Sequence, residues 1–271
     1  MKVLSNCHTH SIFCDGKDTV EEMAAQAYEM GFVSLGFSGH SKNSDDLEWC
    51  MKETEAYRAE VRRMQAKYAG KMRIWLGIEW DCHGALDSSL YEYTLGATHR
   101  MHTEKGDIPV DHSRDLLDHL LEEYLHGDAV ALYRGYYDSV KVAAQQKSPI
   151  FAHFDLVRKY NDGSRYFDTD SFDYRKCALD ALEVVHASGA VLEINTGAIS
   201  RGACSTPYPD PFILDAWHEM GGDVILSSDC HNRFHLDYAF DFALQRAKDA
   251  GFKRILRLGT SSELFESLEI I

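Results

Sequence analysis

The chain has 271 residues, 45% of them hydrophobic, and its 28 basic and 43 acidic side chains give a formal net charge of −15. This length suits one large domain, so we expect a single domain over residues 1–271. The acidic balance excludes a general affinity for nucleic acid, which requires basic surface to neutralise phosphates.

The first residues contain no apolar core of a signal peptide, and no apolar run has transmembrane length. We therefore expect a cytoplasmic protein with no membrane partner. The seven cysteines are scattered and form no C-x-x-C pair, which argues against a disulfide framework. The sequence predicts no particular oligomeric state.

Short apolar runs alternate with helix-favouring segments along the chain. Strands are predicted at residues 2–7, 33–38, 73–78, 91–98, 149–152, 190–195, 223–228 and 254–258. Helices are predicted at residues 19–30, 52–69, 114–125, 128–147, 174–188, in a short segment ending near 220, and at 236–250. The first helix carries the capping box Thr19-x-x-Glu22 and ends at Gly31. Polar segments or loops are expected at 103–115, 158–173 and 198–211.

This alternation of strands and helices indicates βαβ units and a parallel sheet. Continuously apolar strands such as residues 224–226 indicate burial on both faces of the sheet. The first predicted strand is not followed by G-x-G-x-x-G, so a dinucleotide-binding fold receives no support. About seven repeats over this length favour a closed α/β barrel.

Metal-binding residue types recur where the predicted strands end. His8 and His10 follow the first strand, and in extended backbone residues two apart point the same way, so both can reach one metal ion. Further candidates at or just past strand ends are His40, Glu79, His99, His153, Asp229 and His231. A single histidine in such a place is more often a hydrogen-bonded core residue than a ligand, but the recurrence favours a shared site at the edge where barrel enzymes carry their active sites. Mixed histidine and carboxylate ligands fit Zn²⁺, Fe²⁺ or Mn²⁺, and their number predicts two or three divalent ions.

Motifs over nearly the whole chain resemble, in the same order, those of the polymerase and histidinol phosphatase (PHP) family. These motifs are His8-Thr9-His10, Asp15, Ser38-Gly39-His40-Ser41, Gly77-Ile78-Glu79, Gly96-Ala97-Thr98-His99, Ala152-His153, Leu192-Glu193-Ile194-Asn195 and Ser227-Ser228-Asp229-Cys230-His231. Further segments look most like the monofunctional histidinol-phosphate phosphatases of that family: Val157-Arg158-Lys159-Tyr160, Asn195-Thr196-Gly197, Arg201 and Pro207-Tyr208-Pro209. The resemblance implies a distorted (β/α)₇ TIM-like barrel with a trinuclear metal centre at the carboxyl ends of its strands.

The resemblance also implies how the ligands divide among the metals. The first metal would be held by His8, His10, Glu79 and Asp229. The second would be held by Glu79, His99 and His153, with Glu79 bridging, and the third by Asp15, His40 and His231. Glu193 matches a position that faces metal in some relatives, so it is expected to be a ligand or a group behind the ligands. His102 is a rival to His99 and is otherwise expected near the substrate.

The expected activity is hydrolysis of L-histidinol phosphate to L-histidinol and phosphate, a step of histidine biosynthesis, by a hydroxide that bridges two metals. Arg158 and Arg201, in loops after the fifth and sixth predicted strands, are predicted to clamp the phosphate, and alanine at either is expected to lower kcat/KM at least tenfold, about 1.4 kcal/mol. Asp229 or His231 is expected to give a proton to the departing alkoxide. The loops 100–113 and 158–173, which include Tyr160, offer aromatic and acidic groups for an imidazole ring and an ammonium.

Three other functions are compatible with the sequence. A phosphoesterase of the same family could act on another small phosphate ester, such as a nucleotide or a sugar phosphate. A metal-dependent amidohydrolase also begins with His-x-His, but it commonly uses a bridging lysine where this chain offers Glu79 and His99. A metal-binding barrel without catalytic activity is the third alternative.

Overall fold

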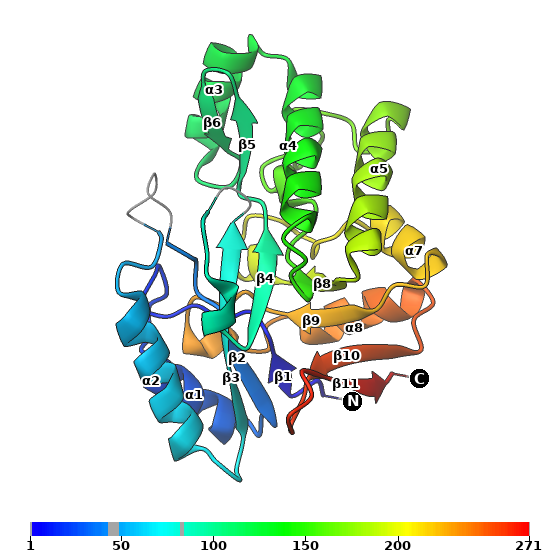
Figure 1. Ribbon diagram of the computed structural model, residues 1–271. Coiled ribbons are helices and arrows are strands. Elements are labelled where there is room, and N and C mark those ends of the chain that lie inside the picture. The colour runs from blue at the N-terminus through cyan, green and yellow to red at the C-terminus, as the bar shows by residue number, and fades with distance from the viewer. Residues whose placement is uncertain (1, 43–48, 82–83, 271) are drawn as a thin grey trace.

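The computed structural model describes residues 2–42, 49–81 and 84–270, and nine of the strands there form one large sheet with helices packed around it (Figure 1). Eight of its nine strands run parallel to their neighbours, and β11 is antiparallel to β10. In spatial order they are β1 (Ser5–Asn6), β2 (Ser34–Phe37), β3 (Arg73–Asp81), β4 (Tyr93–Ala97), β7 (Ile150–Phe151), β8 (Val191–Asn195), β9 (Val224–Ser227), β10 (Arg254–Leu258) and β11 (Phe265–Glu269).

The segments beyond β1 and β9 pair with each other. Thr9 and Cys230 form an isolated parallel bridge, and the backbone N–H of His10 donates to the carbonyl of Cys230 at 3.0 Å. At the carboxyl edge this bridge joins the two ends of a set of seven parallel strands, β1 to β9. The α/β class and the parallel sheet are confirmed, and the bridge is consistent with the expected distorted barrel. Strand β10, which lies next to β9, is also linked to β2, because Ser34 Oγ of β2 donates to the carbonyl of Leu258 of β10 at 2.6 Å.

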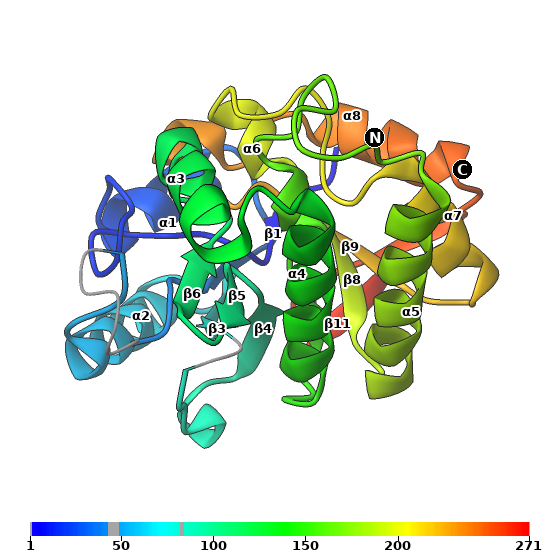
Figure 2. The same ribbon diagram turned by 90° about the horizontal axis from the view of Figure 1, so that it is seen from above.

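The helices lie around the outside of the strands, as Figure 2 shows from above. They are α1 (Val20–Glu29), α2 (Thr54–Lys67), α3 (Arg114–Leu125), α4 (Ala129–Ala144), α5 (Phe172–Ser188), α6 (Gly197–Ser200), α7 (Pro211–Glu219) and α8 (Phe240–Asp249). The predicted capping box is present: the Thr19 side chain accepts from the Glu22 N–H, and the Glu22 carboxylate accepts from the Thr19 N–H. Gly31 follows with φ of +83°, the left-handed conformation that glycine adopts at low cost.

A buried aromatic cluster fixes α4, α5 and α7 against the sheet. Tyr136, Tyr137, Tyr174 and Trp217 are fully buried in one core, and the Tyr137 hydroxyl donates to that of Tyr174 at 2.9 Å. Burial of such large side chains stabilises the fold and holds the strand ends in place. None of the helices in the described part of the chain combines the length and the apolar character needed to cross a membrane.

The structure differs from the sequence prediction in three places. The polar segment after residue 99 contains an antiparallel hairpin, β5 (Arg100–Thr103) and β6 (Gly106–Pro109), whose turn is closed by Thr103 Oγ1 donating to the Gly106 carbonyl. Strand β3 continues to Asp81, so Glu79 lies inside the strand rather than after it. The edge strand β11 was not predicted, because its largely polar sequence lacks the apolar character of a buried strand.

Candidate metal centre

The predicted ligands other than Glu193 converge at the carboxyl edge of the sheet and form four overlapping groups. Within each group, the donor atoms lie within 4.8 Å of one another. Because parallel strands end at one edge, residues far apart in the chain meet there. The contributing residues follow β1 (His8, His10, Asp15), β2 (His40), β4 (His99), β7 (His153) and β9 (Asp229, His231), and Glu79 projects from β3.

Three of the four residues expected for the first metal, His8, His10 and Asp229, form one donor group, whereas Glu79 belongs to two other groups. His8 Nε2 lies 3.4 Å from Glu79 Oε2 and 3.7 Å from Asp229 Oδ1, while His10 Nε2 lies 3.7 Å and 3.2 Å from the same two oxygens. Ligand atoms about 2.0–2.1 Å from a tetrahedral metal are about 3.3 Å apart. His8, His10 and Asp229 therefore have the spacing of a metal site.

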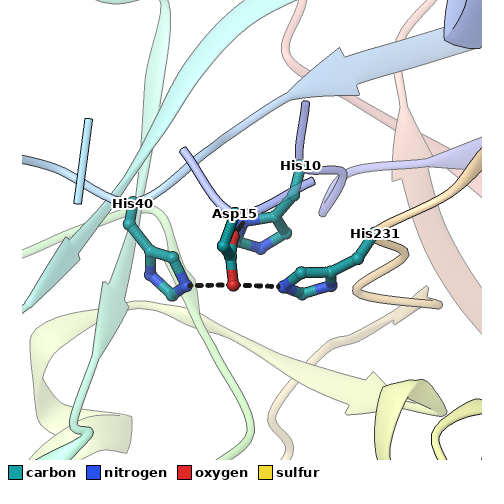
Figure 3. Close-up of side chains that lie close together, drawn as sticks. All are labelled: His10, Asp15, His40 and His231. Atoms are coloured by element: carbon teal, nitrogen blue, oxygen red, sulfur yellow. Dashed lines mark hydrogen bonds and ion pairs between the residues drawn. The ribbon is translucent and has the colours of Figure 1, made fainter. Parts of the chain in front are cut away.

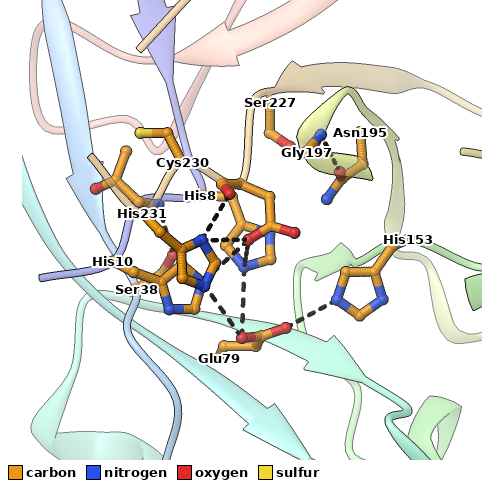
Figure 4. Close-up of polar contacts among 12 residues, drawn as sticks. His8, His10, Ser38, Glu79, His153, Asn195, Gly197, Ser227, Cys230 and His231 are labelled. Carbon is orange, nitrogen blue, oxygen red and sulfur yellow. Dashed lines mark hydrogen bonds and ion pairs between the residues drawn. The ribbon is translucent and has the colours of Figure 1, made fainter. Parts of the chain in front are cut away.

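Glu79 also faces two further histidines with its other oxygen, and Figure 4 shows one of them, His153. Its Oε1 lies 2.9 Å from His153 Nε2 and 3.2 Å from His99 Nε2. The far nitrogen of His99, Nδ1, pairs with Asp81 Oδ2 at 3.0 Å, which directs Nε2 toward Glu79. Glu79 thus belongs to two donor groups, one with His8 and His153 and the other with His40 and His99, instead of one group with His99 and His153, and its bridging role stays a prediction.

The third donor set is centred on Asp15 (Figure 3). Its Oδ2 lies 2.9 Å from His231 Nε2 and 3.7 Å from His40 Nε2, and its Oδ1 lies 3.2 Å from His10 Nδ1. His40 also reaches Glu79 Oε2 through Nδ1 at 2.7 Å. This set is therefore contiguous with the first.

Several of these donors are buried without a hydrogen-bond partner. They are His8 Nε2, His10 Nε2, Asp15 Oδ1, Glu79 Oε2 and His153 Nδ1. Leaving a buried polar atom unpaired costs about 1–3 kcal/mol. Four of these five atoms, all except His153 Nδ1, face another donor atom of the first or third set. Histidine nitrogen and carboxylate oxygen are the donors that Zn²⁺, Mn²⁺ and Fe²⁺ accept, so the residues fit such ions.

The electrostatics of the cluster favour a bound positive charge. Burial alone lowers the pKa of His8, but the carboxylates of Glu193, Asp229 and Glu79 raise it to about 10. Burial alone raises the pKa of Glu79, but His40, His8 and His99 hold it well below its usual range. The carboxylates therefore stay ionised, and metal ions would replace protons on the histidines.

Glu193 lies behind His8 and outside the four donor groups. Its Oε1 accepts from His8 Nδ1 at 2.7 Å and from Ser227 Oγ at 2.6 Å. Its Oε2 accepts from the His153 N–H at 2.8 Å and from Asn195 Nδ2 at 2.9 Å. Both oxygens are thus occupied by the protein. Of the two expectations for Glu193, these contacts fit the group that orients a ligand, because they leave His8 Nε2 as the donor.

We expect Glu193→Gln to lower metal affinity by about 10–100-fold, because an amide cannot accept hydrogen bonds from all four partners. The measurement is metal content after dialysis against graded chelator concentrations. Glu183→Gln, an exposed substitution on α5, is the matched control. Equal metal retention in both variants would contradict the orienting role of Glu193.

Arg201 reaches the centre from the end of α6. Its Nη2 donates to Asp229 Oδ2 at 2.9 Å, and its Nη1 donates to the Asp229 carbonyl at 2.8 Å and to His231 Nδ1 at 3.0 Å. A Cβ at Gly197 would lie 2.8 Å from Asp229 Oδ2 and 2.9 Å from Arg201 Nη2, so glycine is needed for this close packing. The Arg201 side chain is 32% exposed and lines the cavity, which suits the predicted phosphate contact.

Arg158 is placed differently from Arg201, and the predicted phosphate contact for it stays a prediction. Its side chain is 9% exposed and lies outside the residues lining the cavity at the centre. Nε donates to Asp155 Oδ2 at 2.6 Å, Nη1 to Thr206 Oγ1 at 3.2 Å and Nη2 to the Pro207 carbonyl at 2.7 Å. The guanidinium therefore joins the loop after β7 to the loop that contains Thr206 and Pro207.

Two residues, Asp229 and His231, are predicted as proton donors to the departing alkoxide, and that role stays a prediction. Burial raises the pKa of Asp229, but Arg201 and His8 outweigh it and hold the pKa well below its usual range. Burial and the neighbouring His10 lower the pKa of His231 to about 4, so its imidazole is neutral near pH 7.

A cavity of about 150 Å³ opens over the centre, and two basic side chains, Arg201 and Lys159, are among the residues that line it. Lys159 was not predicted as a site residue, although it follows Arg158 directly in a motif of the sequence. Tyr160 lies outside this lining and supports it, since its hydroxyl donates to the carbonyls of Asp111 at 3.0 Å and His112 at 3.1 Å.

Two other residues expected near substrate lie away from the cavity. His102, on β5, is 70% exposed and pairs with Asp107 Oδ1 at 2.7 Å, so a substrate contact for it stays a prediction. Phe167, from the loop 158–173, is buried against Tyr174. The first predicted substrate loop, 100–113, lines the cavity through Asp111 and His112.

The backbone is unusual at two of the converging residues. His153 has φ of +21° and Asp229 has φ of +44°, values that L-residues other than glycine seldom adopt. Such conformations persist where the surroundings enforce them, and they cluster at functional sites. Here they turn the chain directly after β7 and β9, which brings both side chains to the centre.

Comparisons with known proteins agree with this geometry. A Deinococcus radiodurans protein named "Probable histidinol-phosphatase" is 28% identical, with 94% of this chain and 96% of that protein covered. The Bacillus subtilis histidinol-phosphatase is 21% identical, with 88% of this chain and 97% of that protein covered. The crystal structure of the Lactococcus lactis histidinol phosphate phosphatase, complexed with zinc, L-histidinol and phosphate, matches with a TM-score of 0.71 at 19% identity, over 94% of this chain and 96% of that one.

The match to the family itself covers most of the site. The PHP domain matches residues 6–197, well over half of the chain, and this span includes the converging residues from His8 to His153. Asp229 and His231 lie beyond it and complete the donor sets. The chain therefore belongs to the PHP domain family.

Proposed function

We propose that this protein is a metal-dependent phosphatase that hydrolyses L-histidinol phosphate to L-histidinol and phosphate in the cytoplasm. The observation that carries the proposal is the Glu79 carboxylate, 1% exposed, whose two oxygens face separate donor sets beneath a cavity. The similarity to histidinol phosphatases over nearly the full chain supports this choice of substrate.

Two or three divalent ions, such as Zn²⁺, Mn²⁺ or Fe²⁺, would supply a hydroxide near neutral pH and offset phosphate charge. The residues of the chain prepare the site for a dianionic ester. Arg201 and Lys159 add positive charge at the cavity, and the planar guanidinium of Arg201 suits phosphate oxygens. The fixed ligand geometry holds these charges in place before substrate arrives, which lowers the cost of reorganisation.

The test is phosphate release by metal-loaded protein from L-histidinol phosphate, AMP, a sugar phosphate and p-nitrophenyl phosphate. We expect strong preference for L-histidinol phosphate, loss of activity after chelation, and recovery with Mn²⁺ or Zn²⁺. Equal and slow turnover of all four esters would instead indicate a phosphoesterase for another substrate. No turnover by fully metallated protein would reject phosphatase activity and favour an amidohydrolase or a non-catalytic metal-binding barrel.

A further inference from the structure

One histidine of the centre has an unusual partner behind it. Histidines that bind a metal through Nε2 are commonly oriented by a hydrogen bond from Nδ1 to a carboxylate or a carbonyl. His8 and His99 follow this pattern, since each Nδ1 pairs with a carboxylate, at 2.7 Å and 3.0 Å. The Nδ1 of His10 instead lies 3.5 Å from Cys14 Sγ, in hydrogen-bond geometry. A sulfur atom thus stands where the other two histidines have a carboxylate.

The carboxylate of Asp15 lies nearby but does not replace this contact (Figure 3). Its Oδ1 lies 3.2 Å from His10 Nδ1, yet this oxygen has no hydrogen-bond partner within the described part of the chain. Its Oδ2 lies 2.9 Å from His231 Nε2, in the third donor set. Asp15 is therefore directed to the third set, and the sulfur of Cys14 remains as the acceptor for the His10 N–H.

The sulfur of Cys14 is fixed by its other neighbours. Its thiol donates to the carbonyl of Ser11 at 3.5 Å, which leaves the lone pairs of the sulfur to accept from His10. On another side the sulfur packs against Gly39, where a Cβ would lie 2.7 Å from Sγ. His40, a donor of the third set, directly follows Gly39. The sulfur therefore contacts two segments that carry predicted ligands.

Cys14 can be reached from solvent by a route that does not cross the metal centre. A separate cavity of about 350 Å³ is lined by Ile12, Phe13, Cys14, Cys50, Lys52 and Glu53. None of these residues lines the cavity that opens over the centre. Cys14 is partly exposed there, whereas Cys7 and Cys230, which also neighbour predicted ligands, are fully buried. A small solute can thus meet the Cys14 sulfur while the metal centre is occupied.

We propose that Cys14 positions His10 for metal binding, and that oxidation of the Cys14 sulfur by a peroxide weakens the hold of the centre on its metal. Cys14 acts through His10 and is not itself a ligand in this proposal. The inference rests on the metal centre of the proposed function and is independent of the choice of substrate.

The oxidation step is balanced by hydrogen peroxide alone. The O–O bond breaks, one oxygen with its hydrogen forms the S–O bond of a sulfenic acid, and the other leaves as water with the thiol proton. The sulfur gives two electrons to the peroxide. Because the new oxygen withdraws electron density, the sulfur accepts poorly from the His10 N–H. His10 then loses the hydrogen bond that orients its ring, and metal affinity falls.

The first test measures zinc content of zinc-loaded Cys14→Ala and Cys14→Ser after dialysis against graded chelator concentrations. We expect Cys14→Ala to lose zinc at a chelator concentration about 10–100-fold lower than wild type. Cys14→Ser keeps an acceptor and is expected to recover most of the affinity. Cys177→Ser, which replaces a partly buried thiol on α5, is the matched control. Wild-type zinc retention by Cys14→Ala would overturn the positioning role.

The second test treats the zinc-loaded protein with hydrogen peroxide, since zinc itself is not oxidised. We expect wild type to release zinc as Cys14 becomes a sulfenic acid, which dimedone labelling and mass spectrometry detect. A phosphine reductant is expected to restore zinc binding, and Cys14→Ser is expected to keep its zinc. Equal zinc release by Cys14→Ser, or zinc release with labelling at Cys50 alone, would overturn the role of Cys14 oxidation.

The outcomes distinguish this inference from the proposed function. Wild type that binds zinc in a manner dependent on Cys14, but hydrolyses no phosphate ester, would reject the phosphatase and leave the inference standing. Wild type that hydrolyses L-histidinol phosphate and keeps its zinc although Cys14 is oxidised would support the phosphatase and overturn the inference.

Discussion

Glu79→Gln is expected to lower kcat/KM at least 1,000-fold, about 4 kcal/mol of transition-state stabilisation, and to release metal from the protein. The physical reason is the position of the carboxylate between His8 and His10 on one side and His99 and His153 on the other. An amide presents one oxygen and one N–H₂ group, so it can serve at most one of these two donor sets.

The measurements are metal content per chain and kcat/KM for L-histidinol phosphate at saturating metal. Glu183→Gln serves again as the control, because it removes the same charge from an exposed helix position. Full metal content together with wild-type activity in Glu79→Gln would exclude the bridging role. If Glu79→Gln lost its metal because the whole chain unfolded, the thermal transition would show it. Glu79→Asp would then serve as a second variant, because it keeps the negative charge.

The second prediction with a large effect concerns Arg158 and Arg201, which are expected to differ in whether stability or activity is lost. Arg158→Ala is expected to lower the free energy of unfolding by about 3–5 kcal/mol, because it leaves the buried carboxylate of Asp155 without its cation. The same change removes the links to Thr206 and Pro207. For a chain of this size the expected fall in Tm is about 10 °C.

Arg201→Ala is expected to behave in the opposite way, with kcat/KM at least tenfold lower and a smaller change in Tm, because its side chain is partly exposed at the cavity. Thermal unfolding and steady-state kinetics on both variants test the pair. If Arg158→Ala left Tm unchanged and lowered kcat/KM tenfold, the result would instead support the phosphate contact predicted from sequence for Arg158.

The ligands and the two arginines differ in how well their positions could be predicted from the sequence. The convergence of the ligands was predictable because parallel strands end at one edge, so a histidine or carboxylate after each apolar run must approach the others. His8, His40 and His153 illustrate this rule, and Glu79 obeys it although β3 extends two residues beyond it.

The direction of side chains outside the strands was not predictable in the same way. Arg158 ends a short 3₁₀ helix, Leu156–Arg158, and Lys159 follows it as the cap. With about three residues per turn, neighbouring side chains there point about 120° apart. The arginine consequently faces Asp155 and the lysine faces the cavity. Trp49 carried no sequence signal as a neighbour of His112, because only the folded chain brings the two rings together.

The pairing of Thr9 with Cys230 has a consequence for how the protein is made. Synthesis proceeds from the N-terminus, so His8 and His10 leave the ribosome long before Asp229 and His231, which follow β9. Until that late segment docks, the first donor set lacks its aspartate and the third lacks a histidine. Contacts between segments so far apart in sequence form slowly. Tight capture of a metal by the first or third set would therefore follow the docking of the segment after β9.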